Sequence, residues 1–415
     1  MQKQMDLYTL SKQKVAPVLY GYVCWALKEA EKRGICTLYF LSRDGYILLK
    51  IAQQICEKKK IRIECRYLYC SRASLRMPAY HLIGEEAYRL LFQGGYHVTL
   101  KSLLERTQIP RQRWKEILKD AGINSHALCE ENFSKHKTDL YKKRLMKSPL
   151  LQKMLNERSK SAYKNAIAYF KQEKVLENQI FAIVDSGWVG SMQRSFRQLL
   201  EAAGWRGSIV GFYFGMFANP AQDIDGTYKT WYFSKTSGRK NKILFCNNLF
   251  ECFLSAPHGM TMAYQADNEK MVPVLKENLS AEQKTMIECQ ICGILDGTKK
   301  LAECGRHISK KTCSQILYRL MSRPAMDEVR IYRRFLFCDD MTDGYLCSLA
   351  DETKIGKLKN TLLWVRLFHR LFQIPENEDK PFWSFGMIAC VKNPVVRQIY
   401  WMNEYLCQWL RYSLR

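Results

Sequence analysis

The sequence predicts an α/β fold built on a parallel, doubly wound sheet, and two patterns carry that prediction. The first is a strand–helix–strand unit, in which apolar runs rich in β-forming residues at 36–41 and 64–69 flank a segment of helical periodicity at 46–58. The second is the apolar run at 179–184, which is followed by a glycine-containing turn and an amphipathic helix to about residue 203. Strands that alternate with helices favour a parallel sheet covered by helices.

The chain has 415 residues, enough for two or three domains of about 150 residues each. We expect residues 12–245 to form the α/β domain, with further strands at 208–216 and 227–233. The stretch at about 80–175 is basic, helical in composition and poor in strand signals, which predicts a helical insertion. Strand signals fade after residue 245, so we expect 246–415 to be a mainly helical domain.

Composition and charge narrow the possible functions. With 47% apolar and 25% charged residues, the chain is not a disordered or fibrous one. Its net charge of +25 favours anionic partners, such as phosphorylated small molecules, acidic glycans or an anionic membrane surface. Nucleic acid is disfavoured because no recognisable binding module is present. There is neither a secretory signal nor a run of 18 uncharged apolar residues, so we expect a cytoplasmic protein with its 16 cysteines reduced.

A polar turn follows the first predicted strand and is a candidate anion site. It consists of Ser42, Arg43, Asp44 and Gly45, directly before a predicted helix. Arginine offers a fork of donors suited to phosphate oxygens, glycine allows close approach of a ligand, and Asp44 suits a sugar hydroxyl or a magnesium ion. The alternative is that Ser42 or Asp44 only caps the helix. Arg72, after the second strand, either faces the same pocket or is an ordinary surface residue.

A second polar turn follows the strand at 179–184 and has the composition of a sugar-phosphate site. Asp185 can bind ribose hydroxyls, whereas Gly187, Gly190 and Ser191 can hold a phosphate at the start of the next helix. Gln193 lies in the first turn of that helix and adds a further donor. The alternative is that the acid and the hydroxyl are capping residues. The carboxyl ends of parallel strands share one sheet edge, so we expect this turn and the Arg43 turn to open onto one cleft.

These motifs resemble a bacterial family found in capsule and cell-surface polysaccharide gene clusters, whose members are usually catalogued as haloacid-dehalogenase-type hydrolases. The similar stretches are YFLSRDGY, YLYCSR, VDSGWVGS, FECFLSAPHG and QICGIL, at 39–46, 67–72, 184–191, 250–259 and 290–295. The resemblance covers about residues 14–300, and the phosphatase domain that many members carry upstream is expected to be missing here.

The shared region is similar to phosphoribosyltransferases, and this similarity implies a fold and an activity. In that wider family one strand–turn binds pyrophosphate, which corresponds here to 42–45, and a later Asp-containing strand end binds ribose 5-phosphate, which corresponds to 185–191. The chain departs from the family by having Asp185 and Ser186 in place of an acidic pair, and by a shorter turn. The implied fold is a phosphoribosyltransferase-like doubly wound sheet.

The implied function is Mg²⁺-dependent transfer of a ribosyl phosphate, or a similar sugar phosphate, to a glycan or a lipid-linked glycan. The resemblance gives Asp185 the ribose hydroxyls, and Arg43 and Gly45 the pyrophosphate, with Arg72 assisting. Glu251 or His258 is a candidate base for the acceptor hydroxyl, although a helix end with a satisfied histidine is the alternative. A separate phosphatase is a further expected partner. The non-catalytic alternative is a sugar-phosphate-binding scaffold in a polysaccharide assembly complex.

Two further patterns remain open. The segment 223–227 (DIDGT) fits the first motif of haloacid-dehalogenase phosphatases, with Asp339 and Asp343 as possible metal-binding acids, but Pro220 does not suit the buried strand that this motif needs. The predicted helices at 357–373 and 395–415 interleave arginine with aromatic and apolar residues. Such helices either pack into a core or lie on the inner face of an anionic membrane.

Overall fold

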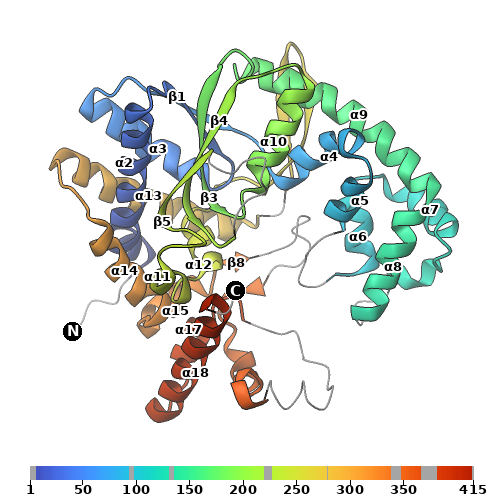
Figure 1. The fold of residues 1–415 in the computed structure, drawn as a ribbon. Helices are drawn as coiled ribbons and strands as arrows, with labels where there is room; N and C mark the ends of the chain where they lie inside the picture. The colour runs from blue at the N-terminus through green and yellow to red at the C-terminus, as the bar shows by residue number, and fades with distance from the viewer. Residues whose placement is uncertain are drawn as a thin grey trace.

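The computed structural model describes residues 6–92, 98–129, 135–218, 227–277, 279–337, 347–365 and 381–413. It is an α/β protein whose central sheet has five strands, all parallel, in the order β2-β1-β3-β4-β5 (Figure 1). The strands are β1 (Thr37–Leu41), β2 (Glu64–Leu68), β3 (Ile180–Trp188), β4 (Ser208–Met216) and β5 (Tyr228–Phe233). The strand predictions are therefore confirmed, except that β3 runs four residues further than expected.

Helices cover both faces of the sheet because successive strand residues point to opposite sides. Leu38 and Phe40 face one side, where they pack with helices α2 (Ala16–Lys32), α3 (Gly45–Lys59) and α13 (Ala281–Glu303). The neighbouring residues Tyr39 and Leu41 face the other side, against α9 (Pro149–Gln172) and α10 (Ser191–Ala202). Figure 1 shows these two layers on either side of the strands. The doubly wound arrangement expected from the sequence is thus present.

The expected helical insertion is present and has an apolar core of its own. It begins at residue 72, somewhat earlier than expected, and projects to one side of the sheet as an arm (Figure 1). Its core includes Leu103, Leu104, Ile117, Leu118 and Leu155. Besides α9, its helices are α4 (Arg72–Ile83), α5 (Glu85–Leu91), α6 (Leu100–Arg106), α7 (Trp114–Asp120) and α8 (Lys135–Lys147).

The C-terminal part does not have a separate core. One continuous apolar cluster joins α2 and the sheet to Leu320, Tyr332 and Trp383, so the boundary expected near residue 245 crosses a single core. The remaining helices are α1 (Leu7–Leu10), α11 (Arg239–Ile243), α12 (Asn247–Phe253), α14 (Lys310–Ser322), α15 (Met326–Tyr332), α17 (Ser384–Ala389) and α18 (Pro394–Ser413).

Residues after 245 are mainly helical, as expected, but the described part also contains two pairs of short antiparallel strands. An antiparallel hairpin of β6 (Thr261–Asp267) and β7 (Lys270–Leu275) lies against α4 and α9, and β8 (Leu336–Phe337) pairs with β9 (Cys347–Ser348). The hairpin is anchored by Tyr264, whose ring stacks on that of Tyr169 with the centroids 4.4 Å apart. The hairpin therefore fixes the insertion to the rest of the molecule. None of the helices in the described part of the chain is long and apolar enough to cross a bilayer.

Candidate functional site

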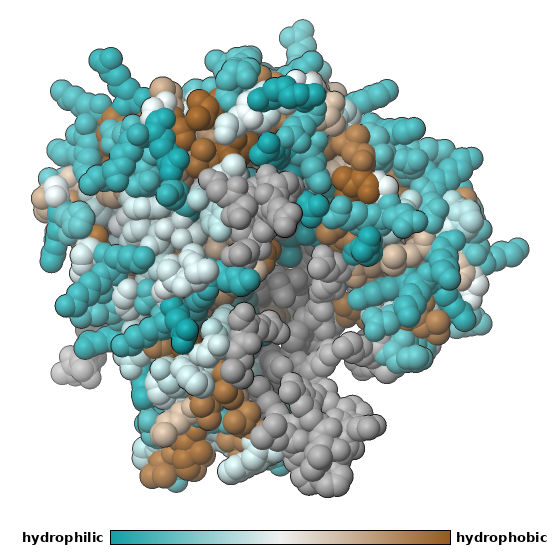
Figure 2. Space-filling view, in the orientation of Figure 1, coloured by the Kyte–Doolittle hydropathy of each residue, from teal (hydrophilic) through white to brown (hydrophobic). Residues whose placement is uncertain are grey.

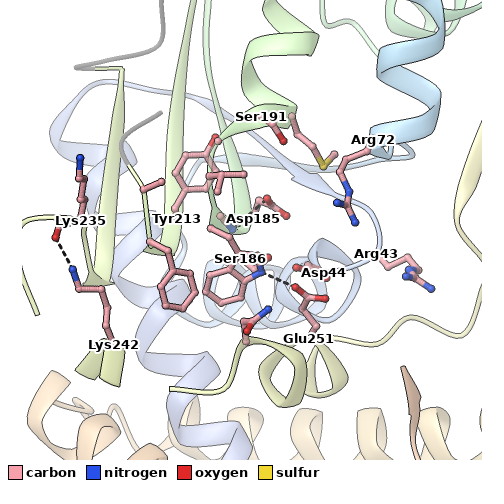
Figure 3. Close-up of a pocket in the computed structure, with 18 of the residues that line it drawn as sticks. Arg43, Asp44, Arg72, Asp185, Ser186, Ser191, Tyr213, Lys235, Lys242 and Glu251 are labelled. Atoms are coloured by element: carbon pink, nitrogen blue, oxygen red, sulfur yellow. Dashed lines mark hydrogen bonds between the residues drawn. The ribbon is translucent and has the colours of Figure 1, made fainter. Parts of the chain in front are cut away.

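A pocket of about 840 Å³ opens at the carboxyl ends of the strands. The strand order reverses between β1 and β3, which is where open α/β sheets form a ligand crevice. The pairing of β1 with β3 stops at Phe40 and Val184, and β3 continues beside β4 as far as Trp188. The Arg43 turn and Asp185 therefore line one pocket, as expected (Figure 3).

Two carboxyl groups from neighbouring strands lie at the centre of this pocket. Asp44 follows β1 and Asp185 belongs to β3, and both are half-buried and line the cavity. Ser186 also lines the cavity, and its hydroxyl opposes the rise in the pKa of Asp44. The Asp185 carboxylate accepts a hydrogen bond from the Gly187 amide at 3.3 Å. Asp44 and Asp185 thus form an acidic pair that comes from two neighbouring strands.

Their environment disfavours ionisation of both acids. Burial, followed by the charge of Asp44, raises the pKa of Asp185 to about 8, although Arg72 and two backbone N–H groups oppose the shift. Burial also raises the pKa of Asp44, against the opposing effects of Ser186, Arg43 and Arg72. Two carboxylates that repel each other in a partly desolvated site favour a bound cation or a shared proton. The pair can therefore stabilise positive charge in a ligand.

Three helices begin at the pocket, so their N-termini provide a positive potential there. Asp44 precedes α3 without a side-chain capping hydrogen bond, and Gly190 precedes α10 in the left-handed conformation, with φ +68°. The capping alternatives for Asp44 and Ser191 are therefore wrong. At α4 the N-cap is Ser71, whose hydroxyl accepts from the amides of Ala73 and Ser74. The amides at the start of α10 remain suited to an anion.

Arg43 and Arg72 lie on the same side of the carboxyl pair in Figure 3, and both line the pocket. Arg43 is half-buried after β1, whereas Arg72 is exposed at the first residue of α4. Together with the helix N-termini, these two guanidinium groups make this side of the pocket an anion-binding surface. The interpretation of Arg72 as an unrelated surface residue is wrong.

The glycines of the two turns serve different purposes. Gly187 lines the pocket with φ +104°, and a Cβ there would lie 2.6 Å from the Gly215 carbonyl oxygen of β4. Gly45 does not line the pocket. It is buried where α3 starts, and a Cβ would lie 2.5 Å from the carbonyl carbon of Phe40. Gly45 therefore allows the helix to pack on its own strand, and the expected role in ligand approach is corrected.

Two further predicted binding residues use their side chains within the fold. Gln193 is 1% exposed, donates to the Thr227 hydroxyl at 3.0 Å and accepts from the Tyr213 hydroxyl at 2.7 Å. Its amide therefore joins α10 to the sheet and does not line the pocket. Ser42 lines the pocket, but its hydroxyl donates to the Cys70 carbonyl oxygen at 2.7 Å and accepts from the Cys70 amide at 3.1 Å. It fixes the turn after β1 to the turn after β2.

Of the two candidate bases, only Glu251 lines the pocket. Glu251 belongs to α12, and its carboxylate accepts from the indole Nε1 of Trp188 at 2.6 Å, as Figure 3 shows. His258 is the satisfied histidine of the alternative interpretation. Its Nε2 lies 2.8 Å from the Tyr67 hydroxyl and its Nδ1 lies 2.9 Å from the Gly259 carbonyl oxygen. Burial lowers the pKa of His258, and the expected role as a base is corrected.

The sequence interpretation missed a group of cations on the opposite side of the pocket. Lys235, Arg239 and Lys242 follow β5, and Arg411 comes from the last turn of α18. The first three follow the carboxyl end of a predicted strand, so the rule applied to the other two turns would have found them. Nothing local in the sequence around Arg411 indicates that it reaches the pocket.

Several sequence predictions lie outside the described residues. They include Asp223, Asp339 and Asp343, and residues 366–373 of the helix predicted at 357–373. Thr227, the last residue of the phosphatase-like motif, is described and directly precedes β5. The motif thus leads into a strand, whereas the phosphatase chemistry requires its first Asp at the end of one.

Within the described ranges, no group of three or more His, Cys, Asp or Glu side chains gathers into a ready-made metal site. No protein-family model matches the chain, and no curated protein matches it either.

Proposed function

We propose that the chain is a phosphoribosyltransferase-like glycosyltransferase that transfers a ribosyl phosphate, or a similar sugar phosphate, to a glycan acceptor. The observation that carries the proposal is that Asp44 and Asp185 share one pocket with the N-terminus of α10 and with the two guanidinium groups of Arg43 and Arg72. One pocket thus offers groups that can bind anions beside a pair of acids. Such a pocket complements a sugar that carries two phosphate-type groups.

The donor would lie across this pattern. Gly187, Gly190 and Ser191 would hold the 5-phosphate at the start of α10, because the first N–H groups of a helix bind anions. Arg43 and Arg72 would hold the pyrophosphate. Asp185 would accept hydrogen bonds from the ribose hydroxyls, and the pocket volume of about 840 Å³ accommodates both the donor and an acceptor sugar.

In the reaction, the bond between the anomeric carbon and the pyrophosphate oxygen breaks, and its electron pair leaves with the pyrophosphate. The acceptor hydroxyl oxygen bonds to that carbon, and its proton passes to a carboxylate, for which Glu251 is the candidate. The sugar carries positive charge as the bond breaks. Preorganised carboxylates aimed at such charge are an effective source of rate enhancement, and this is the role we assign to Asp44 and Asp185.

A magnesium ion fits this donor set. Mg²⁺ is usually bound by one or two carboxylates together with substrate phosphates, and Asp44 and Asp185 are hard oxygen ligands beside the proposed pyrophosphate site. When bound, the ion would neutralise charge on the leaving pyrophosphate.

The place in capsule or surface polysaccharide synthesis rests on the sequence resemblance. In this view the acceptor is a glycan or a lipid-linked glycan, and a separate phosphatase removes the 5-phosphate afterwards. The scaffold alternative drew its support from the single acid at position 185. The Asp44 carboxyl beside Asp185 weakens that support.

The proposal is tested by calorimetric titration with phosphoribosyl pyrophosphate and Mg²⁺. We expect the wild type to bind, and Asp185→Asn to bind about tenfold or more weakly, because it loses a charged hydrogen-bond partner. Asp327→Asn, at a partly exposed acid of α15 that does not line the pocket, is the matched control. If the wild type does not bind, or if Asp185→Asn binds equally well, the proposal is wrong.

A turnover assay then separates the two alternatives. Pyrophosphate release with a glycan acceptor, abolished by Asp185→Asn, supports the transferase. Tight binding without release on any acceptor supports the scaffold. The phosphatase alternative predicts phosphate release that Asp223→Asn abolishes.

A further inference from the structure

A second group of cations lines the pocket on the side away from Arg43 and Arg72. It consists of Lys235, Arg239, Lys242 and Arg411, which we call the distal cluster. Figure 3 shows Lys235 and Lys242 on one side of Asp185 and Asp44, with Arg43 and Arg72 on the other. The donor proposed above uses the Arg43 side, so it leaves these cations without a function.

The distal cluster is not neutralised within the fold. In the described part of the chain, none of its four side chains forms an ion pair, although many other Lys and Arg residues do. Lys235, Arg239 and Arg411 are exposed to the pocket and to solvent. Four cations without counter-charges on one cavity wall give a positive local potential that attracts an anionic group.

Lys242 is the buried member of the distal cluster. It is only 4% exposed, yet it lines the pocket, and its ammonium group donates to the Lys235 carbonyl oxygen at 2.5 Å. The same group lies 5.9 Å from the centre of the Tyr412 ring. Burial, followed by the charge of Arg239, lowers the pKa of Lys242. A buried ammonium that meets no carboxylate is costly, and a bound anion would provide the missing counter-charge.

Aromatic side chains separate the distal cluster from the carboxyl pair. Phe217 stacks on Tyr412 with centroids 5.8 Å apart and lies 5.5 Å from Trp188, and all three line the pocket. The Trp188 indole in turn contacts Glu251. A ligand anchored at the distal cluster would therefore extend along an apolar wall to the candidate base and the carboxyl pair.

We propose that Lys235, Arg239, Lys242 and Arg411 form a second anion subsite, which binds a phosphate or carboxylate group carried by the acceptor. This inference rests on the proposed transferase function. It adds that the acceptor is an anionic glycan or glycan precursor, held by its negative group so that its hydroxyl points towards Glu251 and the anomeric carbon of the donor.

The test uses glycerol 3-phosphate as the probe, because it combines a phosphate with free hydroxyl groups. Binding is measured by calorimetry at 150 mM salt, which screens general surface charge. The parent protein is Arg43→Ala/Arg72→Ala, which removes the two guanidinium groups of the donor side. We expect Lys235→Ala/Arg239→Ala in this background to weaken binding about tenfold or more, since two charged contacts to phosphate are lost.

The matched control is Lys229→Ala/Lys240→Ala in the same background. It removes the same charge from exposed positions of β5 and α11 that do not line the pocket. We expect its affinity to stay within about twofold of the parent. Equal losses in the two pairs, or no loss in Lys235→Ala/Arg239→Ala, would overturn the subsite.

Lys242→Met gives an independent result. It keeps the apolar stem and removes the unpaired charge, so the melting temperature should be unchanged or higher while the probe binds more weakly. Wild-type affinity in folded Lys242→Met contradicts the subsite. If the wild type fails to bind phosphoribosyl pyrophosphate but the probe depends on the distal cluster as described, the donor assignment is wrong and the anion subsite stands.

Discussion

The hydroxyl of Tyr22 lies 2.8 Å from the backbone carbonyl oxygen of Asp185 and also 2.8 Å from that of Phe212. Tyr22 is fully buried on α2, and its hydroxyl connects β3 to β4. The contact with β3 is at Asp185, one residue beyond the last residue of β3 that pairs with β1. A single hydroxyl proton is shared between two acceptors. The position of the Asp185 backbone is therefore held from beneath the pocket by a residue that does not line it.

Replacing Tyr22 with Phe should loosen this position. The change leaves two buried carbonyl groups without the hydroxyl, so we expect a loss of about 1 kcal/mol in the free energy of unfolding. The affinity for phosphoribosyl pyrophosphate should also fall. Denaturant unfolding and calorimetry measure the two effects. Tyr20→Phe, on the same helix but with its hydroxyl beside Cys24, is the control and should leave the affinity unchanged. Equal affinities in all three proteins would contradict the positioning role.

The raised pKa of Asp185, about 8, predicts a dependence of stability on pH. In the unfolded chain an Asp loses its proton near pH 4, whereas the folded protein retains it to higher pH. The folded state thus binds more protons between these values, and its stability must fall as the pH rises from about 4 to 8. Asp44 has its pKa raised in the same direction and contributes a fall of the same sign.

Asp185→Asn removes part of this effect. Its stability relative to the wild type should increase from pH 5 to pH 8, as measured by thermal unfolding across that range. Adding Mg²⁺ with the donor should reduce the stability difference between Asp185→Asn and the wild type at pH 8, because a bound cation favours the ionised carboxylates of the wild type. Parallel pH profiles of the two proteins would show that Asp185 is not the source of the dependence.

Gly187 offers a test of the close packing beside the site. Gly187→Ala places a methyl group 2.6 Å from the Gly215 carbonyl oxygen, at a residue with φ +104°. Gly204 has a similar φ of +86° but nothing within 4 Å of its Cβ position, so Gly204→Ala carries the backbone strain alone. We expect about 1 kcal/mol of destabilisation for Gly204→Ala and about 1–3 kcal/mol more for Gly187→Ala. Equal melting temperatures would mean that β3 and β4 can move apart at no cost.

Much of the sheet and part of the site could be predicted from local patterns. Short apolar runs marked all five parallel strands, and the edge rule for parallel strands brought Arg43 and Asp185 to one pocket. What failed was the assignment of side chains whose partners are distant in sequence. Gln193 and His258 are polar residues next to motifs, and only the fold shows that Thr227 and Tyr67 already bind them.

Other features could not be predicted because they depend on how the segments are arranged in the fold. Asp44 and Asp185 are 141 positions apart, and their role as a pair follows from strand order. Gly45 was interpreted as a ligand contact, although the constraint is the backbone of Phe40 in the preceding strand. The hairpin β6–β7 was missed although the polar segment Asp267–Lys270 contains its turn, where Asn268 has φ +53°. The helix-rich context outweighed that local signal.

The last helix predicts contact with an anionic bilayer. Along α18, Val395, Ile399, Met402, Leu406 and Trp409 are exposed at alternating spacings of three and four residues, which places them on one face. Figure 2 shows apolar surface at the end of the molecule where Figure 1 draws this helix. An anionic membrane would suit the apolar residues of this face and the net charge of +25 of the chain as a whole, and a lipid-linked acceptor would lie at the same surface.

This contact can be measured by co-flotation with vesicles. We expect binding to phosphatidylglycerol vesicles, little binding to phosphatidylcholine vesicles, and a loss of binding in Ile399→Glu/Met402→Glu. Leu82→Glu/Leu140→Glu adds the same charges at exposed apolar residues of other helices and should bind as the wild type does.

If Ile399→Glu/Met402→Glu instead converts a dimer into a monomer in sedimentation experiments, and the wild type does not float with either vesicle, then the face binds a second copy of the chain. Since Arg411 and Tyr412 lie in the last turn of the same helix, a membrane on this face would bring its lipid-linked phosphates close to the distal cluster.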